Sequence, residues 1–595
     1  MDLIDEPWLR VHRLRPPAGT AGKPDPTPVI SLRQLLVSAH EVRDLVVELP
    51  TQKPAILRQV VLPVVVDALG FPADAAEWSA YVRADGFRGE RADKLNAYLD
   101  AHRHRFDLFH PVDPFAQVAG LRTDRDETKS SALLVTTAAS GNNVPIFATR
   151  TEGDRLALTP AEAARWLLHT HCWDTGAIKT GVVGDPRAKQ GKTMGNPAGS
   201  LSQLGIVMPR GETLYETLML NVPYGRTRLK DDHPQWLRRG PRDDHPSGTP
   251  VWDERAARGV LDAWTWQSRR IRLVPEETDE GVRVTRVVVA AGDRLTVLAE
   301  HETHTAWRIE SPERRAKRTA RKAGAGTSTA GDRPEPPPQR PVRHVPGRAA
   351  WRGFHALLAV GRAGEETLAT ATTDGFSTSE LLRNIGAAHH ELGDRFRLRL
   401  ELTGLAYGQK LGNVEDVCHD EVPLPVAALD PLGLAQGALL GAVDQAEALA
   451  KAVNRLADDL RRSVGAEAPD RGSWQESGEA LLHALDPSVR ELLADLRDAG
   501  SNLVTVEELL RGWEVRAGAD AWRVAEQLLV QPAPGAFHGR KVTQGGVSRR
   551  YRLSQAEKAF RYAVDEVLPR RTALREERRA AAAAERTPPT EEGDQ

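Results

Sequence analysis

The chain has 595 residues, which exceeds what one hydrophobic core supports, so roughly two to four domains are expected. Its 80 lysine and arginine residues nearly balance 82 acidic ones, and the net charge of −2 excludes a generally basic nucleic-acid coat. Two cysteines exclude a disulfide framework and favour the cytoplasm, and the sequence shows neither a membrane-spanning run nor a signal peptide.

The first elements are readable from their apolar patterns. Residues 9–14 alternate apolar and polar side chains and predict a strand, and residues 30–36 begin a helix. Residues 52–70 are strongly apolar and predict a buried helix, and residues 76–105 form a further helical stretch. Residues 160–173 begin with proline and predict a helix with one apolar side.

Helix and strand signals continue to residue 408. Residues 211–223 predict an amphipathic helix, and residues 269–276 and 282–290 predict two strands joined by an acidic turn. Residues 395–408 alternate as a strand. Between them, residues 311–347 contain nine lysine and arginine residues and a proline-rich end, so we expect a mobile, solvated loop, with an electrostatic tether to nucleic acid as the alternative.

The last part of the chain is helical in pattern. Four apolar stripes with helical spacing occupy residues 439–460, 476–497, 504–530 and 554–578. Four such helices bury their stripes most simply as a bundle. The predicted fold is therefore α+β: a large mixed α/β domain over residues 1–425, an all-α four-helix bundle over 426–580, and a disordered tail over 581–595.

Residues 140–193 concentrate glycine, asparagine and lysine without the apolar pattern of a core element. Glycine lets the backbone approach a ligand closely, and Lys179, Lys189 and Lys192 supply cations for phosphates. A P-loop over 184–193 is the tempting interpretation, but Pro186 stands where its first glycine belongs, and the residues after Thr193 break helices. A long nucleic acid is the better candidate ligand.

Two further loops have side chains suited to bases. Asn142 and Asn143 carry amides that both donate and accept, and Ile146 and Phe147 are suited to insertion into a base stack, although Phe147 is equally well explained as a core residue. The segment 403–417 places a glycine-rich turn directly after a strand. Its residues Gln409, Lys410, Leu411, Gly412 and Asn413 are either an ordinary hairpin tip or an element that opens a duplex.

The sequence offers no convincing catalytic or metal site. His169 and His171 point about 200° apart on a helix, so they cannot share one ion with Cys172 and Asp174. The segment HETHTAWR lacks the spacing of a zinc protease, and neither a nucleophile elbow nor a nuclease-like pair of acids is found. We therefore expect a binding protein without catalytic residues, cofactor or metal.

Several motifs together resemble a known family, the CasA large subunits of type I-E CRISPR Cascade complexes. The motifs are IDEPWLRV, RFDLFHPVDPFAQV, SGNNVPIF, TGAIKTGVVGDPRAKQGKT, LYETLMLNV, HTAWR and AYGQKLGNVEDV, and they lie in this order between residues 4 and 417. Each is moderately specific, and their number and order carry the resemblance. Some relatives hold zinc through cysteine pairs that this chain lacks.

The resemblance implies a role in RNA-guided surveillance of double-stranded DNA. It implies that Asn142, Asn143, Ile146 and Phe147 contact the crRNA handle near the PAM (the short motif beside the target). It implies that Gly176, Ala177, Ile178 and Lys179 approach the PAM from the minor groove, and that residues 409–413 separate the first base pairs. The implied partners are crRNA, the other Cascade subunits, target DNA and a helicase-nuclease, with no membrane. Two alternatives stay open, a nucleotide-binding enzyme using residues 184–193 and a purely structural scaffold.

Overall fold

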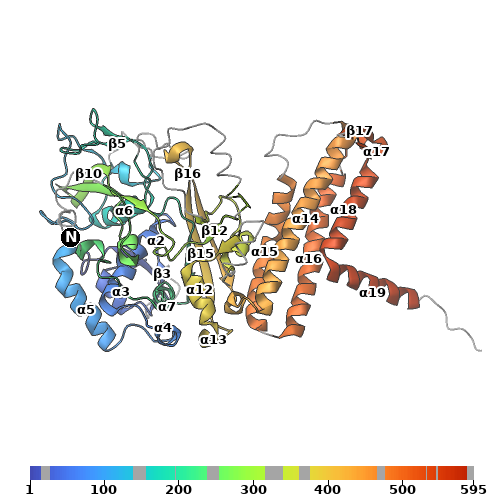
Figure 1. Ribbon diagram of the computed structural model, residues 1–595, viewed down its shortest axis with the longest axis horizontal. Coiled ribbons are helices and arrows are strands. Elements are labelled where there is room, and N and C mark those ends of the chain that lie inside the picture. The colour runs from blue at the N-terminus through green and yellow to red at the C-terminus, as the bar shows by residue number, and fades with distance from the viewer. Residues whose placement is uncertain are drawn as a thin grey trace, which may run out of the picture. The chain divides into compact units, whose positions relative to one another are not determined.

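A computed structural model of the chain divides into two compact units (Figure 1). Unit 1 is Met1–Ala350 with Ala356–Val422, and unit 2 is Trp351–His355 with Pro423–Gln595; the division lies beside the predicted boundary near residue 425. The structure describes residues 1–14, 27–138, 156–194, 196–237, 253–311, 313–314, 316, 339–360, 375–465, 476–500, 502–530, 532–544 and 547–585.

Unit 1 begins with the small sheet expected at the N-terminus. Strand β1 (Leu9–Arg13) pairs antiparallel with β2 (Val29–Ile30) and with β3 (Val42–Leu45). Helix α1 (Leu32–Val37) follows β2, and a capping box formed by Ser31 and Gln34 fixes its start. The alternating pattern of β1 thus reflects one face that is buried against the unit.

The apolar stretch 52–70 forms the predicted buried helix, in three consecutive segments. These are α2 (Gln52–Ile56), the π-helical η1 (Leu57–Val61) and α3 (Leu62–Leu69). The buried guanidinium of Arg58 makes two hydrogen bonds of 2.8 Å to the Glu302 carboxylate. This bidentate pair ties the helix to a segment more than 240 residues away in sequence.

Helix α6 (Pro160–Trp173) confirms the second strong helix prediction, and its C-terminal half is buried. His169 Nε2 lies 2.9 Å from Thr51 Oγ1, and His171 Nε2 lies 2.9 Å from the Ala116 carbonyl oxygen. Burial lowers the pKa of His169 to about 3 and that of His171 to about 4. Both rings are therefore neutral packing residues with separate partners.

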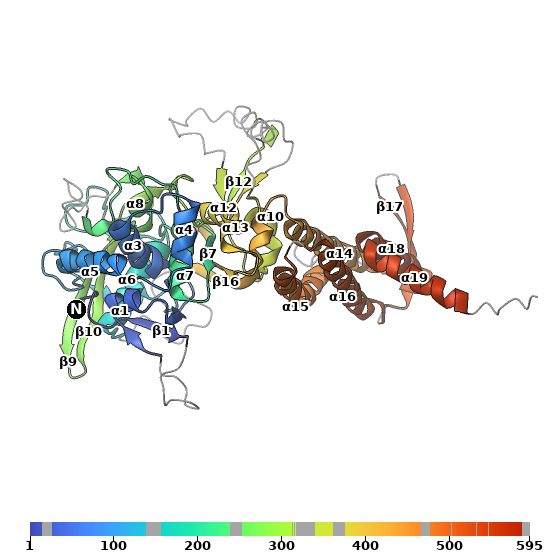
Figure 2. The ribbon, with the colours of Figure 1, turned by 90° about the horizontal axis from the view of Figure 1, so that it is seen from below.

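Two sheets carry the loops of interest. Strand β15 (Leu398–Tyr407) lies between β7 (Ile206–Arg210) and β16 (Val414–Leu424). Strands β9 (Arg269–Thr278) and β10 (Gly281–Ala291) form the predicted hairpin, which projects beyond the neighbouring helices in Figure 2. The short strand β4 (Lys129–Ser130) pairs with the other edge of β10.

Shorter elements complete unit 1. The predicted stretch 76–105 contains two helices, α4 (Ala75–Val82) and α5 (Glu90–His102). The other elements are α7 (Leu214–Leu220), β8 (Glu254–Ala256), α8 (Val260–Trp264), β11 (Arg294–Thr296), β12 (Trp307–Ile309), β13 (Gln339–Pro341), β14 (Gly375–Ser377), α12 (Glu380–Ala387) and α13 (His389–Leu392). The division between the units falls within helix α10 (Phe354–Leu357).

The basic segment 311–347 lies mostly outside the described residues, but its end corrects one expectation. Strand β13 pairs antiparallel with β12, with Trp307 opposite Pro341. The main chain of Val342 continues the contact by donating a 2.8 Å hydrogen bond to the Ala306 carbonyl oxygen. Residues 339–341 thus belong to a sheet and not to a solvated loop.

Unit 2 contains the helices predicted from the four apolar stripes. They are α14 (Leu434–Val464), α15 (Glu476–Ala499), α16 (Leu503–Val530) and α18 (Leu553–Val567), and α14 packs against the other three. Their buried residues recur at the predicted spacing, as in Leu439, Val443, Ala446 and Leu449 of α14. The α+β class with a helical C-terminal part is confirmed.

Three details of unit 2 differ from the prediction. The fourth stripe is broken, because α18 ends at Val567 and a separate helix α19 (Pro569–Glu585) leaves the bundle at an angle (Figure 1). Proline at the first position of α19 has no N–H to continue the earlier helix. Helix α19 runs to Glu585, past the predicted end at residue 580, and a strand pair between α16 and α18 was not predicted: β17 (Arg540–Gln544) with β18 (Val547–Tyr551).

One buried carboxylate starts helix α19. The Glu514 side chain on α16 is fully buried and accepts hydrogen bonds from the main-chain N–H groups of Arg570 and Arg571, at 2.7 and 3.1 Å. It also accepts from Arg570 Nη1 at 3.0 Å. Because the first N–H groups of a helix lack partners inside it, this carboxylate acts as a cap supplied by another helix. Among the described helices, none is both long and apolar enough to cross a membrane.

The buried histidines predict a pH dependence of stability. The unfolded chain protonates His169 and His171 below about pH 6.5, whereas the folded chain keeps both neutral. Stability is thus fully present above pH 6.5 and is lost as the pH falls, by up to about 1.4 kcal/mol per pH unit for each ring. Urea unfolding at pH 7.5, 6.0 and 5.0 measures this slope. Replacing either histidine by glutamine should flatten it, and an unchanged slope in both variants contradicts the assignment.

The Glu514 cap predicts a large loss of stability from a single substitution. Glu514→Ala leaves two helix N–H groups and the Arg570 guanidinium without their buried acceptor, so unfolding of unit 2 should become easier by about 3 kcal/mol. The matched control is Glu507→Ala, which removes a half-exposed partner of the same Arg570 and should cost less than about 1 kcal/mol. Chemical denaturation of both variants makes the comparison. Equal losses of unfolding free energy in the two variants would mean that the buried cap contributes no more to stability than the half-exposed ion pair.

Candidate nucleic-acid interface

The two loops predicted to contact DNA lie against each other in unit 1. The Gly176 N–H donates a 2.7 Å hydrogen bond to the Leu411 carbonyl oxygen. A Cβ atom on Gly176 would lie 3.4 Å from the Lys410 carbonyl oxygen and 3.5 Å from the Leu411 Cβ, which are ordinary contact distances, so the two loops pack directly against each other at this residue. More than 200 residues separate the loops in sequence, and the fold joins them into one surface.

The loop between β15 and β16, residues 408–413, is called the tip below. Its Gln409 and Lys410 side chains are exposed, whereas Leu411, Gly412 and Asn413 are partly buried. Lys410 and Leu411 have φ angles of 56° and 57°, which are unfavourable for residues other than glycine. The Gly408 N–H closes the tip with a 3.0 Å hydrogen bond to the Asn413 carbonyl oxygen. The tip thus presents two long polar side chains on a constrained backbone.

The glycine loop, residues 174–180, is held from the opposite side. Asn196 Nδ2 donates to the carbonyl oxygens of Ala177 and Thr193, at 3.1 and 2.7 Å. The Ile178 side chain between these fixed points is 54% exposed, which is unusual for isoleucine and leaves an apolar group available to a partner. Asn196 was not singled out from the sequence, although an asparagine among glycines and prolines is the kind of residue that bridges turns.

Lys179 lies differently from the prediction. Its side chain is only 11% exposed, and its ammonium nitrogen lies 2.7 Å from Asp174 Oδ2. Arg269 contacts the same carboxylate oxygen. Burial alone would raise the pKa of Asp174, but the two cations lower it to about 2, so the carboxylate stays ionised. Lys179 is thus engaged in an ion pair inside unit 1.

Arg269, the first residue of β9, connects the glycine loop to its surroundings. Its guanidinium is fully buried, and Nη2 donates 2.8 Å hydrogen bonds to the carbonyl oxygens of Thr175 and Pro197. Tyr407, the last residue of β15, donates from its hydroxyl to the Trp173 carbonyl oxygen at 2.6 Å. Two strand ends therefore fix the glycine loop and the tip. Neither residue was identified from the sequence, because only the fold brings their partners close.

Residues 184–193 do not form a phosphate-binding P-loop. Strands β5 (Lys179–Thr180) and β6 (Lys192–Thr193) pair antiparallel, and Lys189 and Lys192 exchange main-chain hydrogen bonds of 2.8 and 3.1 Å across a tight turn. Lys192 lies in a strand and not at the start of a helix, which a P-loop requires. Both lysine side chains are exposed, so the hairpin presents two cations.

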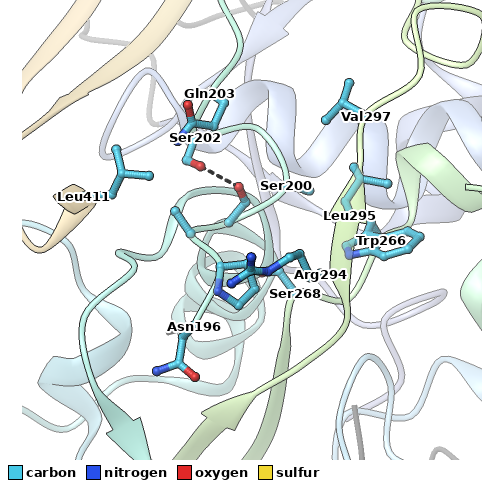
Figure 3. Close-up of a pocket in the computed structure, with 13 residues that line it drawn as sticks. Asn196, Ser200, Ser202, Gln203, Trp266, Ser268, Arg294, Leu295, Val297 and Leu411 are labelled. Carbon is cyan, nitrogen blue, oxygen red and sulfur yellow. Dashed lines mark hydrogen bonds between the residues drawn. The ribbon is translucent and has the colours of Figure 1, made fainter. Parts of the chain in front are cut away.

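A pocket of about 300 Å³ lies beside the joined loops (Figure 3). Leu411 of the tip forms one wall, and Trp266 and Leu295 lie on the other side of the labelled view. The Ser202 hydroxyl donates a 2.7 Å hydrogen bond to the Gly199 carbonyl oxygen. The lining residues are Asn196, Pro197, Ala198, Gly199, Ser200, Ser202, Gln203, Trp266, Ser268, Arg294, Leu295, Val297 and Leu411. Because Leu411 lines the pocket, a movement of the tip would change the shape of the pocket.

One predicted contact loop cannot be placed in the site. Asn142, Asn143, Ile146 and Phe147 lie outside the described residues. Among the residues that are described, no three histidine, cysteine or acidic side chains gather as a metal site would require. Cys172 accepts a weak 3.5 Å hydrogen bond from Gln59, and burial raises the pKa of its thiol to about 11.

Comparison with known proteins identifies the family. The family model described as CRISPR-associated protein Cse1 matches residues 2–524. The CRISPR-associated protein CasA/Cse1 of Thermus thermophilus is 27% identical over 564 residues, which cover 91% of this chain and 95% of the relative.

Solved structures agree with this match. Cse1 of Thermobifida fusca has a TM-score of 0.75 at 29% identity, covering 96% of this chain and 98% of the solved one. A chain of a structure described as a CRISPR RNA-guided surveillance complex shares the fold, with a TM-score of 0.59 at 19% identity over 95% of this chain and 99% of that one. Because the family model spans far more than half of the sequence, this chain belongs to the Cse1 family of CRISPR-associated proteins.

Proposed function

We propose that this chain is the large subunit of a type I-E RNA-guided surveillance complex and that it reads the PAM of double-stranded DNA from the minor groove. The observation that carries the proposal is the hydrogen bond from Gly176 N–H to Leu411 O, which joins the glycine loop to the tip. An element that touches the groove and an element that separates base pairs must act at adjacent positions on the duplex. The two loops meet this requirement.

The exposed groups suit a minor-groove reader that tolerates several sequences. Ile178 offers an apolar contact, Gln409 offers an amide, and Lys410 offers a cation. The minor groove presents a degenerate pattern of donors and acceptors, so contacts of this kind separate classes of base pair and not single sequences. The guide RNA then supplies long-range specificity by base pairing.

The burial of Lys179 changes which cations we assign to DNA. Lys410 at the tip and Lys189 and Lys192 on the β5–β6 hairpin are exposed, and none has an ion-pair partner among the described residues. We assign phosphate contacts to these three side chains. Lys179 is assigned a positioning role, because its ammonium group holds the Asp174 carboxylate that also contacts Arg269.

The partners follow from the same proposal. This chain shares its fold with a chain of an RNA-guided surveillance complex, so the partners we propose are crRNA, the other complex subunits and target DNA. We expect Asn142, Asn143, Ile146 and Phe147 to contact the crRNA handle. The chain is proposed to start strand separation and to recruit a helicase-nuclease, and to carry no catalytic residue of its own.

The first test is flank-dependent binding by the reconstituted crRNA complex, with and without this chain. Targets that differ only in the base pairs beside the protospacer should differ in affinity by about tenfold or more when the chain is present, which corresponds to about 1.4 kcal/mol.

A substitution at the tip tests strand separation in the same complex. Gln409→Ala should slow R-loop formation on every target, since Gln409 is exposed at the tip. Lys94→Ala, on the exposed face of α5, is the control. Indifference of affinity to the flank would favour the scaffold alternative.

The second test separates a DNA contact from a positioning role by salt dependence. Lys410→Gln should reduce the slope of log affinity against log salt by about one, because one phosphate contact is lost. Lys179→Gln should leave that slope within error and lower the melting temperature, because it removes one of the two cations that contact the buried Asp174 carboxylate. If Lys179→Gln changes the slope and Lys410→Gln does not, the two assignments must be exchanged.

A further inference from the structure

The β17–β18 hairpin of unit 2 has a charge pattern that packing does not explain. The sequence between Glu526 and Glu557 contains no acidic residue, whereas the chain as a whole is slightly acidic. Figure 2 shows the hairpin standing out from the helices of its unit. It also lies beyond residues 2–524, the part that matches the family model.

The two faces of the hairpin differ. Side chains alternate along a strand, so Arg540 and Val542 share a face with the cross-strand residues Arg549 and Tyr551. This inner face meets helix α14, because Arg462 of α14 donates a 3.2 Å hydrogen bond to the Tyr551 hydroxyl.

The cations of the inner face have partners. The Arg540 guanidinium lies against Gly465, the C-cap of α14, where a helix end favours positive charge. Burial raises the pKa of the Asp459 carboxyl on α14, and the positive charge of Arg549 opposes that rise. The inner face is therefore accounted for by the bundle itself.

The outer face has no such explanation. Lys541 lies directly opposite Arg550, and Thr543 lies opposite Ser548, with 3.2 Å between the two hydroxyl oxygens. Lys541 and Arg550 are exposed and have no ion-pair partner in the described part of the chain. Like charges directly across a strand pair destabilise it. Two opposed cations flanked by two hydroxyls suit an anionic surface that approaches from outside.

We propose that the outer face of this hairpin binds the phosphate backbone of double-stranded DNA without reading its sequence. Lysine, arginine, serine and threonine are the side chains that commonly contact phosphates. Single strands are instead held by stacking on aromatic rings, and the one aromatic ring of the hairpin, Tyr551, belongs to the inner face. This contact is separate from the glycine loop and the tip and does not rest on the function proposed for them.

The test uses the full chain and a labelled duplex of arbitrary sequence, titrated between about 50 and 200 mM salt. The double variant Lys541→Gln, Arg550→Gln should reduce the slope of log affinity against log salt by about two and weaken binding several-fold at the lowest salt. Lys541→Arg keeps the charge and should keep the slope. A double variant on the same unit, Lys558→Gln with Arg561→Gln, removes two exposed charges from α18 and is the matched control.

The salt dependence of the hairpin variant and of the α18 control decides between a specific contact and a general charge effect. A reduced slope in the hairpin variant alone supports the proposal, and melting temperatures of all variants guard against misfolding. An equal reduction in the α18 control would mean a general charge effect and overturns it. Loss of binding to the single-stranded form of the same sequence, with duplex binding unchanged, also overturns it. Flank dependence in the crRNA complex should survive the hairpin variant, so failure here is distinguishable from failure of PAM reading.

Discussion

The surface proposed to meet DNA depends on one buried guanidinium. Arg269 stands at the first position of a long strand, and its side chain contacts Asp174 and the carbonyl oxygens of Thr175 and Pro197. The loops on either side are rich in glycine and would otherwise adopt many conformations. A rigid sheet end thereby gives a flexible segment one arrangement, which is how loops acquire functional precision without being part of the core.

Arginine suits this position for a geometric reason. Its planar group carries several donors in a fixed fork, so one side chain satisfies a carboxylate and two carbonyl groups from separate loops. An apolar residue of equal volume would remove the guanidinium donor from the carbonyl oxygens of Thr175 and Pro197, at a cost of about 1–3 kcal/mol for each, and would leave Lys179 as the only cation on Asp174 among the described residues. The pair of Arg58 and Glu302 uses the same property to tie the buried helix to a distant loop.

The sequence predicted those parts of the structure that local pattern controls. The first three stripes of unit 2 were correct because burial on one face leaves a periodic record. The helix from residue 52 was correct because its run of apolar residues is buried on every side, and helix α6 because Pro160 marks its start. The β17–β18 hairpin was missed because its outer face is polar and its inner face mixes arginine with valine and tyrosine, although Gly545-Gly546 is a recognised two-residue turn signal. Lys179 was predicted to approach the PAM, and its ion pair was not foreseen, because nothing near it in sequence discloses Arg269, whose position is set by the fold.

The backbone of the tip has a consequence for how its target would be held. Lys410 and Leu411 keep φ angles that such residues rarely adopt, and the tertiary hydrogen bond from Gly176 helps to maintain them. The shape of the tip therefore belongs partly to the glycine loop. Since each loop already helps to hold the other in one conformation, a duplex that touches both would meet two contacts whose relative position is fixed before binding. PAM recognition by the glycine loop and strand separation by the tip would then be coupled directly through the hydrogen bond between Gly176 and Leu411. No chain of contacts across unit 1 would be needed to connect them.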